Sequence, residues 1–486
     1  MDEHNDWLDN AFEPFRHENR PRDWAGIEEV QRRSTRRRRR RLAATSGGVS
    51  VALAAVLVVG FVSFGSRGRT PGSLPESSGA IQRLAGPNGS VHLVADVKVS
   101  AVLGTRASEE ALAAAEERFA LQLTRAEASG TPTGNVLLSP MSAHIDLAML
   151  ELGAAGATAQ EIATALQSSG LSADTQAAAW NGLLQSLLAG ETAGELHVAN
   201  SIWVRDGLSV EARFLRETAE TFGNNTYEAD FESNSAEQAI NAWVAEETAG
   251  RIKVLYQPGD LAASTEVVLA NALHFHAAWQ KDLFGQAVVE HQPFYPSSGS
   301  SVSVPMVVDS QDALSFAQGT GYDAVQLPYT NGRFAALLIE PTGGSIGSLL
   351  ATLDPAGLSG IVRALHSGFI SFSMPELTLS ARRSLDEPLS SMGMAQAFNS
   401  ADFSPMLGQL LGATNQQVGG VEQAVTLDVN KWGTDAAAAT GVSVQPSDAH
   451  STTATIAFDH PYLFLIRDTV TGTILFSSVV NNPAGA

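Results

Sequence analysis

Hydrophobic residues recur at helical spacing through much of the first half of this chain. Residues 108–124 are rich in Ala, Glu and Leu at that spacing, and Ser108 could cap the start of a helix there. The same spacing predicts three further helices, over residues 143–150, 160–166 and 177–188.

Apolar runs with little polar interruption follow later in the chain. Residues 267–275 and 334–339 are nearly continuous apolar runs, as expected of strands that are buried on both faces. Residues 456–480 predict two strands around a turn at Thr471-Gly472. Because helices come first, long strands follow and no regular strand–helix alternation occurs, the pattern predicts an α+β domain.

A segment with strand character leads into a run of small residues. Val421, Val425, Leu427 and Val429 share one face at period two. The small residues that follow are Gly433, Thr434, Asp435, Ala436, Ala437, Ala438, Ala439 and Thr440. Alternate positions of this run supply the small inward side chains that a strand needs in order to enter the middle of an existing sheet. The four alanines also suit a helix, so the run alone leaves both interpretations open.

An arginine-rich segment near the N-terminus precedes a long stretch without charge. Arg32, Arg33 and the arginines at 36–41 stand directly before residues 42–64. That stretch of roughly 23 residues is long enough to cross a membrane, and the arginines before it predict a cytoplasmic N-terminus. A cleaved signal peptide is the alternative because Gly47-Gly48 shortens the apolar core, although the preceding charged region is longer than such signals carry. Nucleic-acid binding by the arginines is less favoured.

These features predict four parts of the chain. Residues 1–41 form a largely disordered cytoplasmic tail, 42–64 a transmembrane helix, 65–100 a flexible linker rich in Gly, Ser and Pro, and 101–486 a folded domain. The predicted localisation is the cell membrane, as a single-pass protein with the folded domain extracellular. If the anchor is cleaved, the domain is secreted.

Composition narrows the chemistry and the partners. The 486 residues carry a formal net charge of −21. They include no cysteine, which excludes disulfide bonds and catalysis by a thiol. Residues 1–66 hold 11 Arg and 9 acidic residues, a net of +2, so the remainder carries −23. An acidic domain repels polyanions, and no Lys or Arg occurs between Arg125 and Arg205. We therefore expect no nucleic-acid partner and no heparin-type polyanion.

Two patterns suggest catalysis or metal binding only weakly. Residues 343–347 match GxSxG at Ser345, but Pro341-Thr342 separates the match from the preceding strand, so a glycine-rich turn explains it better than a catalytic serine. His274 and His276 would share a face of a strand and could bind a metal, but no third ligand is evident. The sequence therefore predicts neither an enzyme nor a bound metal or other cofactor.

Several short motifs occur in a fixed order from about Ala101 to the C-terminus. They are NVLLSPMS at 135–142, LGAAGAT at 152–158, ANSIW at 199–203, INAWV at 240–244, LANALHF at 269–275 with Trp279, LPY at 327–329, MGM at 392–394 with ADFS at 401–404, and HPYLF at 460–464 with Arg467-Asp468. In this order they resemble the motifs of the serpin family of serine protease inhibitors. With the predicted anchor, the chain would be a membrane-anchored, bacterial-type member.

The resemblance implies both a fold and a mechanism. The expected serpin fold has a large central, mostly antiparallel sheet, further sheets, about nine helices and an exposed reactive-centre loop. A protease that cleaves the loop forms an acyl-enzyme, and the freed arm then inserts into the central sheet and stalls deacylation. Residues 433–440 correspond to the hinge of that arm. They lack the proline and large charged residues common in non-inhibitory members, so we expect an inhibitor; the alternative is a non-inhibitory binding or sensing module.

The resemblance also assigns residues that control opening of the sheet. They are Ser139, Ser142, Asn271, Trp279, Gln423, Glu376 and Lys431. Gln423 stands where the family usually has a histidine, so pH control through that position is not expected. Glu376 and Lys431 reverse the charges of the family's usual pair, which predicts an ion pair of opposite polarity.

The usual distance from the hinge places the reactive bond between Ser447 and Asp448. Counting back from Phe458 can place it nearer His450. No Lys or Arg occurs from Trp432 to Ile466, which disfavours trypsin-like proteases. The small and β-branched residues that remain favour elastase-like or subtilisin-like serine proteases, with an aspartate-specific protease as the alternative.

Overall fold

The computed structural model describes residues 81–485 except 96–100, 190–195, 224, 249, 281–282, 286, 310–312, 409–416 and 436–452. The chain divides into two units, residues 1–75 and residues 76–486. The described residues all belong to the second unit.

Ten α-helices form in the described residues, against about nine expected. They are α3 (Arg106–Gly130), α4 (Pro140–Leu152), α5 (Gly156–Ala165), α6 (Ala173–Leu187), α7 (Ala212–Thr221), α8 (Ser235–Glu247), α9 (Ile346–Thr352), α10 (Pro355–Ala364), α11 (Asp386–Ser391) and α12 (Ser404–Leu407). The cap of α3 is Thr105 and not Ser108. The Thr105 and Ser108 side chains each accept a hydrogen bond from the other's backbone N–H, so the two residues form a capping box.

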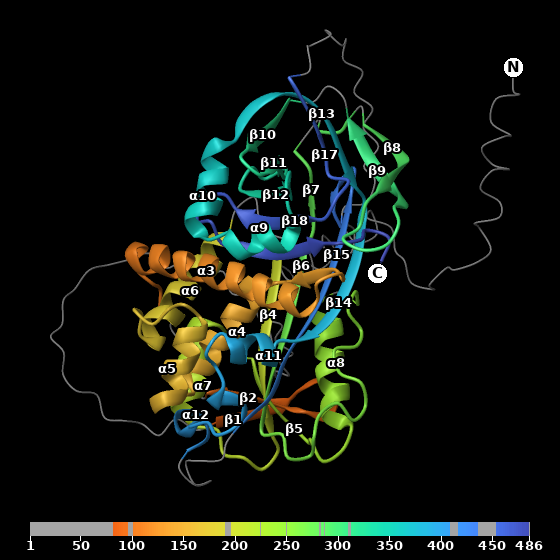
Figure 1. The fold of residues 1–486 in the computed structure, drawn as a ribbon. Coiled ribbons are helices and arrows are strands. Elements are labelled where there is room, and N and C mark those ends of the chain that lie inside the picture. The colour runs from red at the N-terminus through yellow and green to blue at the C-terminus, as the bar shows by residue number, and fades with distance from the viewer. Residues whose placement is uncertain are drawn as a thin grey trace, which may run out of the picture. The chain divides into compact units, whose positions relative to one another are not determined.

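A nine-stranded sheet, which we call the main sheet, carries the candidate functional site. Its strands in spatial order are β1 (Ile81–Ala85), β2 (Val91–Ala95), β5 (Thr226–Ala229), β4 (Leu196–Arg205), β6 (Val267–Phe275), β15 (Val418–Asn430), β16 (Gly433–Thr434) and β7 (Ala277–Ala278), with β14 (Leu377–Ser384) paired to β15. In Figure 1, β14 and β15 run side by side. Two of its strand pairs are parallel, β4–β5 and β6–β15, and the others are antiparallel.

A ten-stranded second sheet contains the C-terminal strands. In order it holds β3 (Val136–Leu138), β19 (Ile474–Val480), β18 (Tyr462–Asp468), β12 (Phe334–Pro341), β11 (Tyr322–Pro328), β10 (Ala313–Gly319), β13 (His366–Pro375), β9 (Val302–Asp309) and β8 (Val288–Phe294), with β17 (Ala454–Ala457) on β13. The turn expected at Thr471-Gly472 connects β18 to β19. The predicted α+β class is confirmed.

The main sheet is buried on both faces, which explains the continuous apolar run of β6. Val267, Leu269 and Leu273 pack into the larger core with the fully buried helix α4. Val268 and Ala270 point the opposite way, into a smaller core formed with α8. The helices α4 and α8 therefore cover opposite faces of the sheet (Figure 1).

Part of the predicted linker is an ordered hairpin. Residues 81–95, assigned to the flexible segment 65–100, form β1 and β2 at the edge of the main sheet, joined through Pro87–Gly89. Asn88 and Gly89 both have positive φ there, as tight turns require. The prediction was wrong for these residues because β1 is mostly exposed and lacks an apolar face. In β2, Leu93 and Ala95 are the buried residues.

The predicted membrane localisation is contradicted. No helix within the described ranges is both long enough and apolar enough to cross a membrane. The fully buried α4, for example, has 13 residues and so spans about 20 Å, against a hydrocarbon layer of about 30 Å. The tail at 1–41 and the span at 42–64 lie outside the described residues. The predicted cell-membrane localisation is therefore wrong, and the membrane-anchored, bacterial-type assignment is not supported.

Candidate functional site

The two middle strands of the main sheet pair at one end and part at the other. β6 and β15 are paired in parallel from Val267 and Val418 to Asn271 and Gln423, where their ladder ends. Both strands continue beyond this point without pairing to each other. A cavity of about 260 Å³ lies where they part, and its walls come from β6, β14, β15, β16 and β19, including His274, Phe275, Leu379, Leu427, Thr434 and Phe476. We call this opening the gap.

The first residues of the predicted hinge lie at the top of the gap. β16 pairs on one side with β15, through Thr434–Val429 and Gly433–Asn430. On its other side it pairs with β7, through Thr434–Ala277 and Gly433–Ala278. Gly433 has φ of 150°, a value that favours glycine. Two hinge residues are thus already members of the sheet, in antiparallel register with both neighbours.

Thr434 is buried and hydrogen-bonded at this position. Its side chain points inward and the residue is only 2% exposed. Its hydroxyl lies 2.6 Å from the hydroxyl of Tyr329. Tyr329 belongs to the LPY motif, and its spacing does not reveal this contact because the two residues are 105 positions apart.

Trp279 lies beside the turn that joins β15 to β16. Its ring stacks on Tyr329 at a centroid distance of 4.6 Å. Its indole N–H donates to the carbonyl of Asn430 at 2.9 Å, and its backbone N–H donates to the carbonyl of Trp432 at 3.0 Å. Trp279 therefore fixes both ends of the turn between β15 and β16.

Glu376 and Lys431 are neighbours, but the predicted ion pair between their side chains is not formed. A carboxylate oxygen of Glu376 accepts instead from the backbone N–H of Lys431 at 3.4 Å. The Lys431 ammonium donates to the carbonyl of Ala287 at 3.3 Å and lies 4.5 Å from the Trp432 ring centroid. The lysine side chain points away because a carbonyl and an aromatic face hold its charge there.

This geometry predicts that the two charges act independently. Reversing both, as Glu376→Lys with Lys431→Glu, should change the free energy of unfolding by the sum of the two single changes, within about 0.5 kcal/mol. Glu376→Gln should cost little, since an amide oxygen can still accept from the Lys431 N–H, whereas Glu376→Ala should cost about 0.5–1 kcal/mol. Urea unfolding of these five variants and the unmodified protein measures this, and a coupling above about 1 kcal/mol between the two charge reversals would mean that the side chains do pair.

Gln423 and Ser139 join the main sheet to α4 at the lower end of the gap. The Gln423 amide accepts from the Ser139 backbone N–H at 2.8 Å and donates to the Ser139 carbonyl at 2.9 Å. The Ser139 hydroxyl donates to the carbonyl of Leu475 at 2.9 Å. All three contacts are buried, and Gln423 sits in the last pair before β6 and β15 part.

Asn271 and Ser142 complete the predicted cluster in different ways. Asn271 faces Gln423 across the β6–β15 ladder and its amide donates to Asn200 on β4. The hydroxyl of Ser142 is fully buried in α4 and has no hydrogen-bond partner among the described residues. The structure therefore brings Ser139, Gln423 and Asn271 together, and leaves Ser142 nearby without a polar contact.

The rest of the predicted loop lies outside the described residues. This applies to Ala436–Ala439, Thr440, and both residues of the predicted reactive bond, Ser447 and Asp448. The description resumes at Thr453, whose backbone N–H donates to the carbonyl of Phe369 at 2.8 Å. β17 then pairs in parallel with β13, so the far end of the loop is anchored on the second sheet.

Ser345 has a structural role. Its hydroxyl accepts from the backbone N–H of Ser348 at 3.2 Å and caps the start of α9. Thr342, Gly343 and Gly344 separate it from β12, which ends at Pro341, so the serine does not follow directly on the strand as a nucleophile elbow requires.

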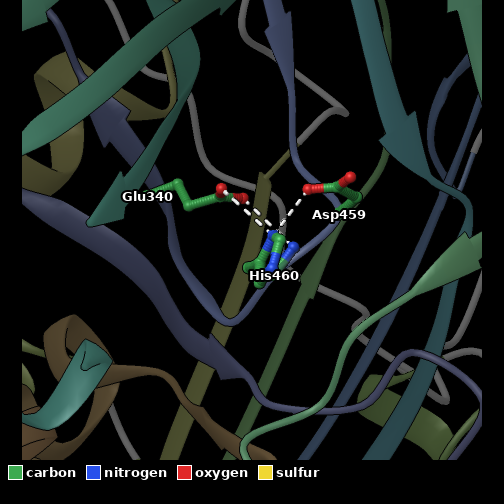
Figure 2. A group of neighbouring side chains, drawn as sticks. All are labelled: Glu340, Asp459 and His460. Carbon is green, nitrogen blue, oxygen red and sulfur yellow. Dashed lines mark hydrogen bonds and ion pairs between the residues drawn. The ribbon is translucent and has the colours of Figure 1, made fainter. Parts of the chain in front are cut away.

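One group among the described residues has the side chains to hold a metal ion. Glu340, Asp459 and His460 bring potential ligand atoms within 4.8 Å of one another (Figure 2). Burial, together with the nearby Asp459 and Asp323, raises the pKa of Glu340 to about 8. The imidazole of His460 is already 2.7 Å from Asp459 and stacks on Tyr295. The group comes from the end of β12 and the β17–β18 connection, a combination that sequence spacing did not reveal.

Comparison with known proteins identifies relatives over most of the chain. The family model described as Serpin (serine protease inhibitor) matches residues 114–483. Serpin-Z1C of Triticum aestivum is 30% identical over 387 residues, covering 76% of this chain and 95% of the relative. Serpin A9 of Mus musculus is 32% identical over 377 residues, covering 75% and 87%. Plasminogen activator inhibitor 1 of Sus scrofa is 30% identical, covering 75% and 91%.

Solved structures share the fold. Thyroxine-binding globulin in complex with thyroxine superimposes with a TM-score of 0.68 at 26% identity, covering 76% of this chain and 99% of that one. The thermophilic serpin tengpin in its native state gives a TM-score of 0.70 at 22% identity, covering 81% and 99%. The expected architecture, with a large central sheet, further sheets and flanking helices, is thereby confirmed.

Proposed function

Because the chain belongs to the serpin family, we propose that it inhibits serine proteases by trapping them as acyl-enzymes. The observation that carries the proposal is the pair of hinge residues, Gly433 and Thr434, placed in the main sheet directly above an unfilled gap. A strand that continued from them would fill that gap. The family alone does not decide between inhibitory and non-inhibitory members, whereas this arrangement favours insertion.

The register of β16 gives the path that the inserting strand would follow. Each step forward from Thr434 moves one residue back along β15 and one residue back from Ala277 toward β6. The backbone N–H of Asp435 already donates to the carbonyl of Asp428 at 2.6 Å, which continues this register by one step. Continued further, it would place the hinge residues in these positions: Ala436 between Leu427 and Phe275, Ala438 between Val425 and Leu273, and Thr440 between Gln423 and Asn271.

This path matches the small residues to the space that receives them. Residues at 436 and 438 would point inward with Thr434, toward the buried side chains of Phe275 and Leu427, where alanine leaves room. Thr440 would lie between Gln423 and Asn271, the last β6–β15 pair, so insertion past residue 439 requires these two residues to separate. The cluster around Ser139 would then act as the control on full opening of the sheet.

Insertion is expected to be strongly favourable. Five residues, 435–439, would fill the gap and pair with a strand on each side, and each hydrogen bond contributes about 0.5–1.5 kcal/mol net. About ten such hydrogen bonds therefore contribute on the order of 5–15 kcal/mol, comparable with the whole stability of an ordinary domain. The intact protein would be held out of this state by a kinetic barrier.

The proposed chemistry is that of an incomplete proteolysis. The serine oxygen of the protease attacks the carbonyl carbon of Ser447, the bond to the Asp448 nitrogen breaks, and the new amine leaves with a proton while an ester joins protease and inhibitor. Insertion of the freed arm would carry the protease away from its bound geometry and leave the ester unhydrolysed. The residues near Ser447 favour an elastase-like or subtilisin-like protease.

Mixing the protein with such proteases tests the proposal. We expect a protease–inhibitor band that survives denaturing electrophoresis, with mass spectrometry placing the cut at or near Ser447-Asp448. A trypsin-like protease should give no such band. Cleavage of the loop by every protease without any stable band would contradict trapping and favour the non-inhibitory alternative.

A further inference from the structure

Asp435 marks the point where the hinge leaves the main sheet. It has φ of 52°, in the left-handed region that aspartate tolerates better than most residues. Its side chain is only 14% exposed. One carboxylate oxygen forms an ion pair with Arg251, and the other lies 2.6 Å from Nε2 of His274. Nδ1 of His276 contacts its carbonyl oxygen.

These contacts come from two segments on the α8 side of the sheet. His274 belongs to β6 and His276 directly follows it, two residues apart on the shared face that their sequence spacing indicated, with ring planes 14° apart. Arg251 lies just beyond the end of α8, the helix that packs against Ala270 and Ala424 of β6 and β15. The segment over the sheet is thus tied directly to the hinge.

We propose that Arg251, with His274 and His276, forms a dock for Asp435 that keeps the hinge in the main sheet before the loop is cut. This inference rests on the proposed inhibitory function, which it extends by naming residues that position the arm. β16 has only two residues, and a pair of ladder steps at a chain reversal is a weak attachment on its own. The dock supplies a charged, partly buried anchor one residue further on.

The dock would matter for the speed of insertion. Once Thr434 is in register, the following residues add to an existing strand, and the unfavourable step of finding the register has already been taken. A hinge outside the sheet would have to find it while deacylation competes. Loss of the dock should therefore shift the outcome from trapping toward simple cleavage.

The charges around the dock make Arg251 its principal residue. Asp428 on β15 is a second acid beside Asp435; burial raises its pKa, Asp435 raises it further and Arg251 lowers it. His197 on β4 lies 6.0 Å from His274, ring to ring. Burial lowers the pKa of His274, so His274 is a neutral donor to Asp435 at neutral pH. Arg251 is then the permanent positive charge in contact with Asp435 among the described residues.

Hydrogen exchange on the intact full-length protein tests the dock without requiring a protease. The Asp435 amide, bonded to Asp428, should exchange at least tenfold faster in Arg251→Gln and in Asp435→Asn than in the unmodified protein. Arg251→Lys should restore most of the protection. Arg106→Gln, which breaks an exposed ion pair with Glu110 on α3, is the matched control and should change nothing at the hinge. Equal protection in Arg251→Gln and the unmodified protein would overturn the proposal.

The number of inhibitor molecules consumed per trapped protease gives the second measurement. We expect this ratio to rise at least threefold for Arg251→Gln and to return toward the original value for Arg251→Lys, since a purely structural defect would not follow the charge. An unchanged ratio for Arg251→Gln would contradict the effect on insertion. If the unmodified protein traps no protease, the proposed function fails, while the exchange measurement still decides whether the dock exists.

Discussion

Thr434→Arg is expected to convert the protein from an inhibitor into a substrate. Thr434 is 2% exposed, points inward between β15 and β7, and lies against Tyr329. An arginine cannot place its charge there without leaving it buried and unpaired, which costs several kcal/mol. A barrier raised by about 2.7 kcal/mol slows insertion about a hundredfold. The denaturation-resistant complex should then fall at least tenfold while the cleaved form accumulates.

Thr434→Ser is the matched control for this substitution. Serine keeps the hydroxyl that meets Tyr329 and loses only a methyl group, so trapping should stay within about twofold of the original. Both variants should still be cut at the same bond, because the substitution lies 13 residues before Ser447. If Thr434→Arg traps as well as Thr434→Ser, the inward hinge position is not on the path of insertion.

Gln423→Ala is expected to produce the largest loss of stability at the lower end of the gap. Gln423 is 2% exposed and satisfies both the N–H and the carbonyl of Ser139. Each of these two buried groups costs about 1–3 kcal/mol when left without a partner, so the free energy of unfolding should fall by roughly 2–6 kcal/mol. Because the same contacts hold the β6–β15 pair at the point where the strands part, the intact protein should also convert to an inactive form faster on storage.

Gln423→His provides the comparison. A neutral imidazole can replace one of the two hydrogen bonds, so its stability should lie between those of the original and Gln423→Ala, and it should fall as the imidazole becomes protonated. The original protein, with an amide at 423, should lack that pH dependence at this site. Urea unfolding at several pH values measures both effects. A change below about 0.5 kcal/mol in the free energy of unfolding for Gln423→Ala would show that the contacts to Ser139 do not stabilise the protein.

The sequence predicted the elements whose burial follows directly from the order of apolar and polar residues along the chain. β6 begins and ends at the residues of its apolar run, because a strand buried on both faces has no polar positions to blur its limits. The helices were found but begin earlier than expected. α3, for instance, starts after Thr105 because its capping box uses a threonine that the apolar spacing did not include. The hairpin of β1 and β2 was missed because its exposed edge strand lacks the alternation that identifies a half-buried one.

Sequence reasoning selected residues of the site but not their contacts. Trp279 lies beside the turn into the hinge, and Gln423 bonds to Ser139 at the last β6–β15 pair. The contacts that hold the hinge could not be read from spacing, since Arg251 and Asp435 are 184 positions apart and meet only through the packing of α8. The expected Glu376–Lys431 ion pair failed for a related reason: charge signs suggest a pair, but the Trp432 ring and the Ala287 carbonyl decide where the lysine points.

Thermal unfolding of the intact protein and of the same protein nicked in its loop tests insertion most directly. If residues after Asp435 complete the main sheet once the chain is cut, the nicked form should unfold at a temperature at least 15 °C higher than the intact form, and Thr434→Arg should abolish most of that increase. A nicked form that unfolds at or below the temperature of the intact protein would contradict the account.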